Sequence, residues 1–130
     1  RFGYQWKKKI IATTEAPQAI GPYSQGWIVG DTIYTSGQLG IDVSTGKLAD
    51  GIEAQTHAAL KNLKAVLKEA GADLNNIVKT TVFVKDLADF ATVNQIYGTY
   101  FDTEYPARSC VQVAKLPLDG LVEIECVAVK

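Results

Sequence analysis

The two patterns that decide the fold lie in residues 51–84, GIEAQTHAALKNLKAVLKEAGADLNNIVKTTVFV. In the first part, apolar residues recur at the three- and four-residue spacing of an amphipathic helix: Ile52, Ala59, Leu63, Val66, Leu67 and Ala70. Gly71 follows the last of them, where a helix commonly stops. In the second part, residues 77–84 have the composition of a strand, and residues 80–84 within it are largely apolar on both faces. The stretch therefore predicts a helix over 51–71 followed by a buried strand.

The rest of the chain adds strands on both sides and a second helix. In chain order, the predicted elements are strands over 9–12, 27–29 and 32–35, the helix over 51–71, the strand over 77–84, a helix over 86–101, and two strands flanking the loop at 116–120. Gly30-Asp31 between two β-branched runs signals a hairpin, and Asp86 or Asp89 can cap the second helix. The order βββαβαββ predicts an α+β fold, a six-stranded mixed sheet with both helices packed on one face.

One face of this sheet is left without a cover. Residues 80–84 and 126–129 are apolar on both sides, whereas two helices can cover only one side. A large apolar surface on a soluble protein normally meets a partner. We therefore expect a homo-oligomer in which the second faces of the sheets pack together.

The composition fits one globular domain. The chain has 130 residues, of which 47% are hydrophobic and 21% are charged, and its net charge is −1. The sequence holds no Met, so we interpret residues 1–6 as a tag or an N-terminal extension and residues 7–130 as a single domain.

Several classes of function are disfavoured by composition. No apolar segment approaches the ~20 residues of a membrane helix, and the triplet Lys7-Lys8-Lys9 is too short to be a nucleic-acid-binding stripe. Two cysteines do not form a disulfide framework, so we expect a reducing, cytoplasmic location. His57, Cys110 and Cys126 lack the spacing of metal ligands, and no metal site is predicted.

The last two strands carry the residues that suit a core least. With a period of two, Arg108, Cys110 and Gln112 share one face of their strand. The alternate residues, Ser109, Val111 and Val113, are predicted to face the core. In the final strand, Glu123 and Glu125 lie opposite an apolar set. If the two strands form a hairpin, Arg108 and one glutamate share a face.

Two interpretations of this pair stay open. It can be a solvated cross-strand ion pair, which contributes little to stability. It can also be an anion pocket, because arginine grips a carboxylate with two parallel hydrogen bonds and a nearby Glu can handle protons. Cys110 can be a nucleophile or a wall of the pocket, and the wall is favoured because the lone histidine, His57, is predicted on a helix and inert.

Two loop segments hold further candidates. Tyr23 lies in a turn-rich loop, where it can pack over the sheet edge or line a pocket. Ser36 and Gly37 end a predicted strand, where backbone amides can face a ligand. By themselves these two segments do not decide between structure and function.

Taken together, the stretches closely resemble the RidA (YjgF) family of reactive intermediate deaminases. The resemblance rests on APQAIGPYSQG at 16–26, TSGQLG at 35–40, IVKTTVFVKDLADFATVN at 77–94, YPARSCVQVAKLP at 105–117 and VEIECVAV at 122–129. It implies a fold similar to that of the small bacterial chorismate mutase and a homotrimer with clefts between subunits. It also implies an enzyme without metal or cofactor that hydrolyses 2-iminobutanoate and 2-iminopropanoate to 2-oxo acids and ammonia.

The resemblance assigns roles to particular positions. Arg108 is expected to hold the carboxylate of the 2-imino acid, and Glu123 is expected beside the attacking water. The residues expected to line the cleft are Tyr23, Ser36, Gly37, Asn94 and Cys110. The alternatives are an endoribonuclease or translation inhibitor and a non-catalytic protein that binds small carboxylates. The near-neutral charge speaks against RNA, and Arg108 speaks against binding alone.

Overall fold

The computed structural model describes residues 8–102 and 104–130 of the chain. In order, its elements are β1 (Lys8–Ile11), β2 (Gly26–Val29), β3 (Thr32–Thr35), β4 (Gln38–Leu39), β5 (Ile41–Asp42), β6 (Lys47–Leu48), α1 (Gly51–Glu69), β7 (Ile77–Val84), α2 (Phe90–Gly98), β8 (Ala107–Gln112) and β9 (Val122–Val129). Three short 3₁₀ turns, η1 (Leu74–Asn76), η2 (Leu87–Asp89) and η3 (Pro117–Asp119), lie between them. The predicted extension over residues 1–6 lies outside the described residues.

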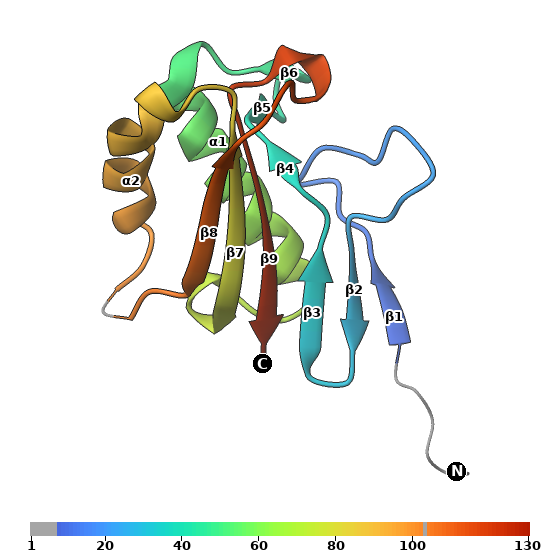
Figure 1. The fold of residues 1–130 in the computed structure, drawn as a ribbon. Helices are drawn as coiled ribbons and strands as arrows, with labels where there is room; N and C mark the ends of the chain where they lie inside the picture. The colour runs from blue at the N-terminus through green and yellow to red at the C-terminus, as the bar shows by residue number, and fades with distance from the viewer. Residues whose placement is uncertain (1–7, 103) are drawn as a thin grey trace, which may run out of the picture.

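The sheet is mixed and both helices lie on one side of it (Figure 1). Its strands run in the order β1-β2-β3-β9-β7-β8, and β4 pairs with the beginning of β9. Only β7 and β8 pair in parallel among the strands described; the other pairs are antiparallel. The predicted α+β fold is confirmed, with the short β4 as a seventh strand that the sequence pattern did not indicate.

The core lies between the sheet and the helices. Five residues of the predicted stripe of α1 are buried, from Ala59 to Ala70, whereas Ile52 in its first turn is only partly buried, and the stripe meets the alternate residues of β7 and β9. Those buried residues include Leu63 and Val66 of α1, Val82 of β7 and Ile124 of β9. The predicted hairpin between β2 and β3 is also present, with Gly30 at a φ of 62° in its turn.

The predicted hairpin of the last two strands is wrong. β7 lies between β8 and β9, and it pairs with β8 in parallel and with β9 antiparallel. The reason is the helix that precedes β8: the chain leaves β7, passes through α2 and returns alongside β7, which is a parallel β-α-β connection. The segment after β8 then carries the chain past β7 to its other edge.

The predicted facing of β8 is also wrong. Arg108 is in register with Thr80, and Cys110 is in register with Val82, both of which are buried under the helices. Arg108 and Cys110 are therefore half-buried on the helix side, while Ser109 and Val111 are exposed. The cause is local: α2 presents aromatic rings that accept a guanidinium, so the apolar residues of this edge strand point outward.

The second face of the sheet is uncovered in the single chain, as predicted. Large apolar side chains on it remain open to solvent, among them Ile10 at 49%, Tyr34 at 50%, Val111 at 43% and Val129 at 43% exposure. The face has the character of a contact surface.

Candidate functional site

One large cavity collects four of the seven predicted site residues. Tyr23, Ser36, Gly37 and Glu123 all line it, and its volume is about 950 Å³. We call it the Glu123 cavity. Its walls are the loop before β2, the segment from the end of β3 through β4, the turn η3 and the second face of β9. The sequence placed these residues in separate segments, and the fold brings them together.

Gly37 and Glu123 are in close contact. A Cβ atom added to Gly37 would lie 2.7 Å from the carboxyl carbon of Glu123, which is too close for two non-bonded carbons. The pairing of β4 with β9 brings the two segments together, because Leu39 is in register with Glu123. A residue without a side chain at position 37 therefore leaves the space that the Glu123 carboxyl group occupies.

The carboxyl group of Glu123 is half-buried in this cavity. Burial raises its pKa above the ordinary value, and the negative charge of Glu125 raises it further. Glu125 lies two residues along the same face of β9 and lines the same cavity. A carboxyl group of this kind can both accept and release a proton nearer to neutral pH than an exposed glutamate.

The loop over the cavity is fixed by a buried glutamine that sequence reasoning missed. Gln25 is 5% exposed. Its side-chain amide donates to the carbonyl oxygens of Thr13 and Pro17 at 3.0 and 2.8 Å, and its oxygen accepts from the amide of Thr13 at 2.7 Å. Ser36 donates from its hydroxyl to the carbonyl oxygen of Ser24, which ties the same loop to β3. The one signal in the sequence was the position of this polar residue directly before β2.

Tyr23 projects from this loop. Its side chain is 51% exposed, and its hydroxyl oxygen accepts from the amide of Ile20 at 3.4 Å. The ring is therefore available at the mouth of the Glu123 cavity and is not needed to fill the core.

Arg108 lies in a different environment, between two aromatic rings of α2. Its guanidinium carbon is 4.9 Å from the ring centre of Tyr97 and 5.5 Å from that of Phe90. Tyr97 is fixed in turn, because its hydroxyl shares a 2.8 Å hydrogen bond with Thr80. Within the described residues no carboxylate forms an ion pair with Arg108. The cross-strand ion pair is thus not formed within the chain, and the guanidinium keeps its donors for another anion.

Asn94 and Cys110 belong to the same side of the molecule as Arg108. Asn94 follows Phe90 by one helical turn and precedes Tyr97 by three residues, so the three share a face of α2. Its side-chain oxygen is buried and, among the described residues, has no hydrogen-bond partner. Burial raises the pKa of the Cys110 thiol, while Arg108 opposes this effect. Cys110 therefore favours its neutral thiol form, which suits a wall of the site better than a nucleophile.

The structure does not bring Arg108 and Glu123 together within one chain. Arg108 points to the helix side of the sheet with Thr80, whereas Glu123 is in register with Phe83 on the second face. The seven predicted residues therefore form two groups. The Arg108 group consists of Arg108, Asn94 and Cys110, and the Glu123 group consists of Glu123, Tyr23, Ser36 and Gly37.

Residues 8–102 and 104–130 contain no cluster of three or more His, Cys, Asp or Glu that could hold a metal ion. No helix in these residues is long and apolar enough to span a membrane. His57 is exposed on α1, where its Nδ1 atom lies 2.6 Å from the hydroxyl oxygen of Tyr100, and it does not line the Glu123 cavity.

Comparison with known proteins identifies the family. Residues 13–130 match the family described as Endoribonuclease L-PSP. The chain is 55% identical over 124 residues to the 2-iminobutanoate/2-iminopropanoate deaminase of Mus musculus, covering 95% of this chain and 92% of that one. It is 52% identical over 125 residues to the protein of the same name from Salmonella typhimurium, covering 94% and 98%.

Solved structures agree with this match. The E. coli YjgF gene product superposes with a TM-score of 0.90 at 50% identity, covering 94% of this chain and 98% of that one. E. coli TdcF with bound serine gives a TM-score of 0.91 at 47% identity, with the same coverage of 94% and 98%. The chain therefore belongs to the endoribonuclease L-PSP family, which is the RidA/YjgF family.

Proposed function

We propose that the chain is a hydrolytic deaminase of reactive 2-imino acids, acting on 2-iminobutanoate and 2-iminopropanoate. The observation that carries the proposal is Arg108, a half-buried guanidinium that two rings hold and that no carboxylate in the described chain neutralises. Such a group favours a planar carboxylate, which every 2-imino acid carries. The names of relatives about half identical to this chain support the same activity.

We infer further that the complete site forms between two copies of the chain, in a homotrimer. The Arg108 group lies at the outer edge strand β8, and the Glu123 group lies on the uncovered face of β9. A second copy that packs on this face can bring its own β8 edge beside the Glu123 cavity. The exposed apolar residues of the face supply a reason for this packing.

The chemistry requires little beyond positioning. The guanidinium of Arg108 would fix the carboxylate of the 2-imino acid and thereby orient the adjacent C=N carbon. The carboxylate of Glu123 would take a proton from water as its oxygen attacks that carbon. Glu123 passes this proton to the imine nitrogen, which gives a neutral carbinolamine. The carboxylate then takes the hydroxyl proton as the C=O bond forms and delivers it to the nitrogen, which leaves as ammonia when the C–N bond breaks. One imine and one water give one 2-oxo acid and one ammonia.

The remaining cleft residues would shape this reaction without taking part in bond changes. Gly37 leaves room for the Glu123 carboxyl group, and Tyr23 and Ser36 lie along the cavity wall. Asn94 offers a buried oxygen on the Arg108 side, and Cys110 forms part of that wall. The free thiols of Cys110 and Cys126 fit the cytoplasm as the proposed compartment.

Cleavage of RNA is less well supported, although the family description mentions it. The Glu123 cavity contains two carboxyl groups, Glu123 and Glu125, which repel a phosphate backbone. The net charge of −1 adds no attraction for nucleic acid.

The test measures how much 2-iminobutanoate remains available to react with semicarbazide. A threonine dehydratase generates 2-iminobutanoate in the presence of semicarbazide, and the rate of semicarbazone formation is recorded with this protein, with Arg108→Ala, or with neither. We expect the unaltered protein to suppress the semicarbazone and the variant not to. Arg108→Lys should lose about 10²-fold in kcat/KM, because a point charge cannot reproduce the two parallel hydrogen bonds.

Two results would count against the proposal. If the unaltered protein leaves semicarbazone formation unchanged for the imines of both threonine and serine, it is not a deaminase of these compounds. If Arg108→Lys retains full activity, the carboxylate is held elsewhere. Thermal unfolding of each variant checks that the fold survives the substitution.

A further inference from the structure

The turn η3 carries two non-glycine residues in the left-handed region of backbone space. Leu118 has a φ of 60° and Asp119 has a φ of 58°. A Cβ atom makes this conformation unfavourable, and leucine has no side-chain hydrogen bond to offset the cost. Among the described residues these are the non-glycine positions with positive φ. Such strain persists only where surrounding contacts hold it.

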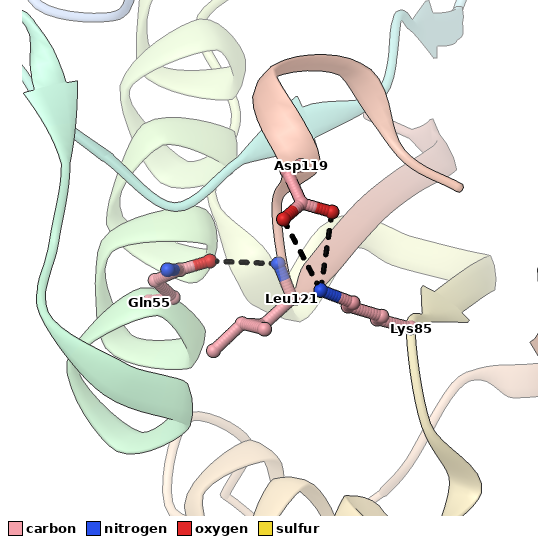
Figure 2. Close-up of polar contacts among 4 residues, drawn as sticks. All are labelled: Gln55, Lys85, Asp119 and Leu121. Atoms are coloured by element: carbon pink, nitrogen blue, oxygen red, sulfur yellow. Dashed lines mark hydrogen bonds and ion pairs between the residues drawn. The ribbon is translucent and has the colours of Figure 1, made fainter.

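Contacts from two other elements hold this turn in place (Figure 2). The ammonium group of Lys85, directly after β7, lies 3.1 and 3.2 Å from the two carboxylate oxygens of Asp119. The side-chain oxygen of Gln55, on α1, accepts from the amide of Leu121 at 2.9 Å. Gln55 itself is 5% exposed and donates to the carbonyl oxygen of Ala49 at 3.0 Å. The turn is therefore fastened at its last residue and again just after it.

The held turn positions a leucine that the chain does not use for packing. Leu118 is 58% exposed, yet it lines the Glu123 cavity together with Pro117 and Tyr23. A leucine in a strained conformation that leaves more than half of its surface exposed gains little stability for the chain. The role of Leu118 is therefore to be found in the Glu123 cavity, which its side chain lines.

The reaction proposed above indicates what Leu118 meets there. The imine carbon is planar and has three substituents: the carboxylate, the nitrogen and the alkyl group. If Arg108 holds the carboxylate and Glu123 serves the water and the nitrogen, the alkyl group must point to another part of the cavity. Leu118 and Pro117 supply an apolar surface on the same cavity as Glu123.

We propose that Leu118 contacts the alkyl group of the 2-imino acid and sets the preference of the enzyme for longer over shorter chains. Asp119 and Lys85 are positioning residues, since their ion pair holds the turn from which Leu118 projects. The proposal deepens the proposed function and rests on it. It assigns the discrimination between imines to one side chain.

The experiment compares two imines that differ by one methylene. An amino-acid oxidase generates 2-iminobutanoate from 2-aminobutanoate and 2-iminopropanoate from alanine, and semicarbazide competition gives kcat/KM for each. The variant is Leu118→Asn, because asparagine tolerates positive φ and removes the apolar surface. We expect the ratio of kcat/KM, longer imine to shorter, to fall about tenfold, the lower end of the effect of one methylene in an apolar pocket.

Control variants separate this role from a structural one. Val78→Asn changes an apolar residue of 49% exposure near the N-terminal end of β7, at the opposite end of the strand from Lys85. It should leave the ratio of kcat/KM for the two imines unchanged. Lys85→Ala should lower the ratio in part, and Lys85→Arg should restore it, because the ion pair with Asp119 is then remade. The thermal midpoint of Leu118→Asn should not fall, since the substitution relieves backbone strain.

Each outcome has a distinct meaning. If both imines are hydrolysed and Leu118→Asn leaves their ratio unchanged, the assignment of Leu118 is overturned while the proposed function stands. If the unaltered protein hydrolyses neither imine, the proposed function itself fails. If Leu118→Asn lowers the assembled mass measured by light scattering, Leu118 is an interface residue and the proposal is also overturned.

Discussion

The guanidinium of Arg108 is held by two aromatic rings, and this contact leaves its N–H groups able to bind a carboxylate. The faces of Tyr97 and Phe90 restrain the guanidinium without using its N–H groups, because a cation–π contact engages the plane of the ion. An ion pair would have used those donors. The side chain is therefore both restrained and free to bind, so little rotamer entropy remains to be lost when a carboxylate arrives.

At the same scale, the pKa of Glu123 predicts how activity depends on pH. Burial and the charge of Glu125 raise this pKa, so Glu123 takes up a proton at a higher pH than an ordinary glutamate. A protonated Glu123 cannot accept a proton from water, and we expect kcat/KM to fall as the pH drops through this pKa. Glu125→Gln removes the neighbouring charge and should move the acid limb of the pH profile to lower pH.

The measurement is the pH profile of kcat/KM for 2-iminobutanoate, with the spontaneous hydrolysis subtracted at each pH. Glu53→Gln serves as the control, because Glu53 is an exposed residue in the first turn of α1. It should leave the acid limb in place. An acid limb that Glu125→Gln does not move, or moves upward, would contradict the electrostatic coupling described for the cavity.

At the scale of elements, the sequence pattern predicted the helices and strands whose formation depends mainly on neighbouring residues. The helix over 51–71 was found at Gly51–Glu69 and the strand over 77–84 at Ile77–Val84, because the apolar residues that indicated each element include those that it buries in the core. The pairing of β8 was missed, since the loop at 116–120 has the composition of a hairpin turn while the partner strand is chosen by the β7-α2-β8 connection. Sequence spacing carries no information on that choice.

In the candidate site, too, the residues could be predicted from the sequence, whereas their spatial arrangement could not. The residues themselves came from motifs, but the facing of Arg108 depends on Tyr97 and Phe90, which belong to another element. The alternation of β8 suggested the opposite facing, because Val111 is apolar and yet exposed in the single chain. β4, β5 and β6 have two residues each, too few to form a pattern, and the sequence indicated only a loop there.

The contact between α1 and the segment after β4 makes a prediction about stability. A Cβ atom on Gly40 would lie 2.5 Å from the Cα of Gln55, so backbone and not a movable side chain blocks the space. We expect Gly40→Ala to lower the free energy of unfolding by about 3 kcal/mol, the upper range for overpacking. Urea denaturation followed by circular dichroism measures the change.

Gly46→Ala is the matched comparison. Gly46 has a φ of 74° and open space around its Cα, so only backbone conformation opposes a side chain there. Its cost should be about 1 kcal/mol. Equal costs for the two substitutions would mean that the contact between Gly40 and Gln55 is looser than the structure indicates.

At the scale of the whole molecule, the proposed homotrimer would explain both the separation of the two groups and the uncovered face of the sheet. Neither group is complete: the Arg108 group lacks a carboxylate, and the Glu123 group lacks a cation among the residues that line its cavity. The sheet face that carries Glu123 also exposes Tyr34, Val111 and Val129. Packing between copies would bury this face and complete the site in one step.

This explanation predicts that two inactive variants restore each other. Arg108→Ala keeps an intact Glu123 group, and Glu123→Gln keeps an intact Arg108 group, so each alone should be inactive. After co-refolding at equal amounts, a site that joins two different copies has a chance of about one half times one half to receive both intact groups. We expect about one quarter of the unaltered activity, measured by semicarbazide competition. Activity no higher than that of either variant, in mixtures whose mixed assembly is verified by native mass spectrometry, would mean that each site is built within one chain.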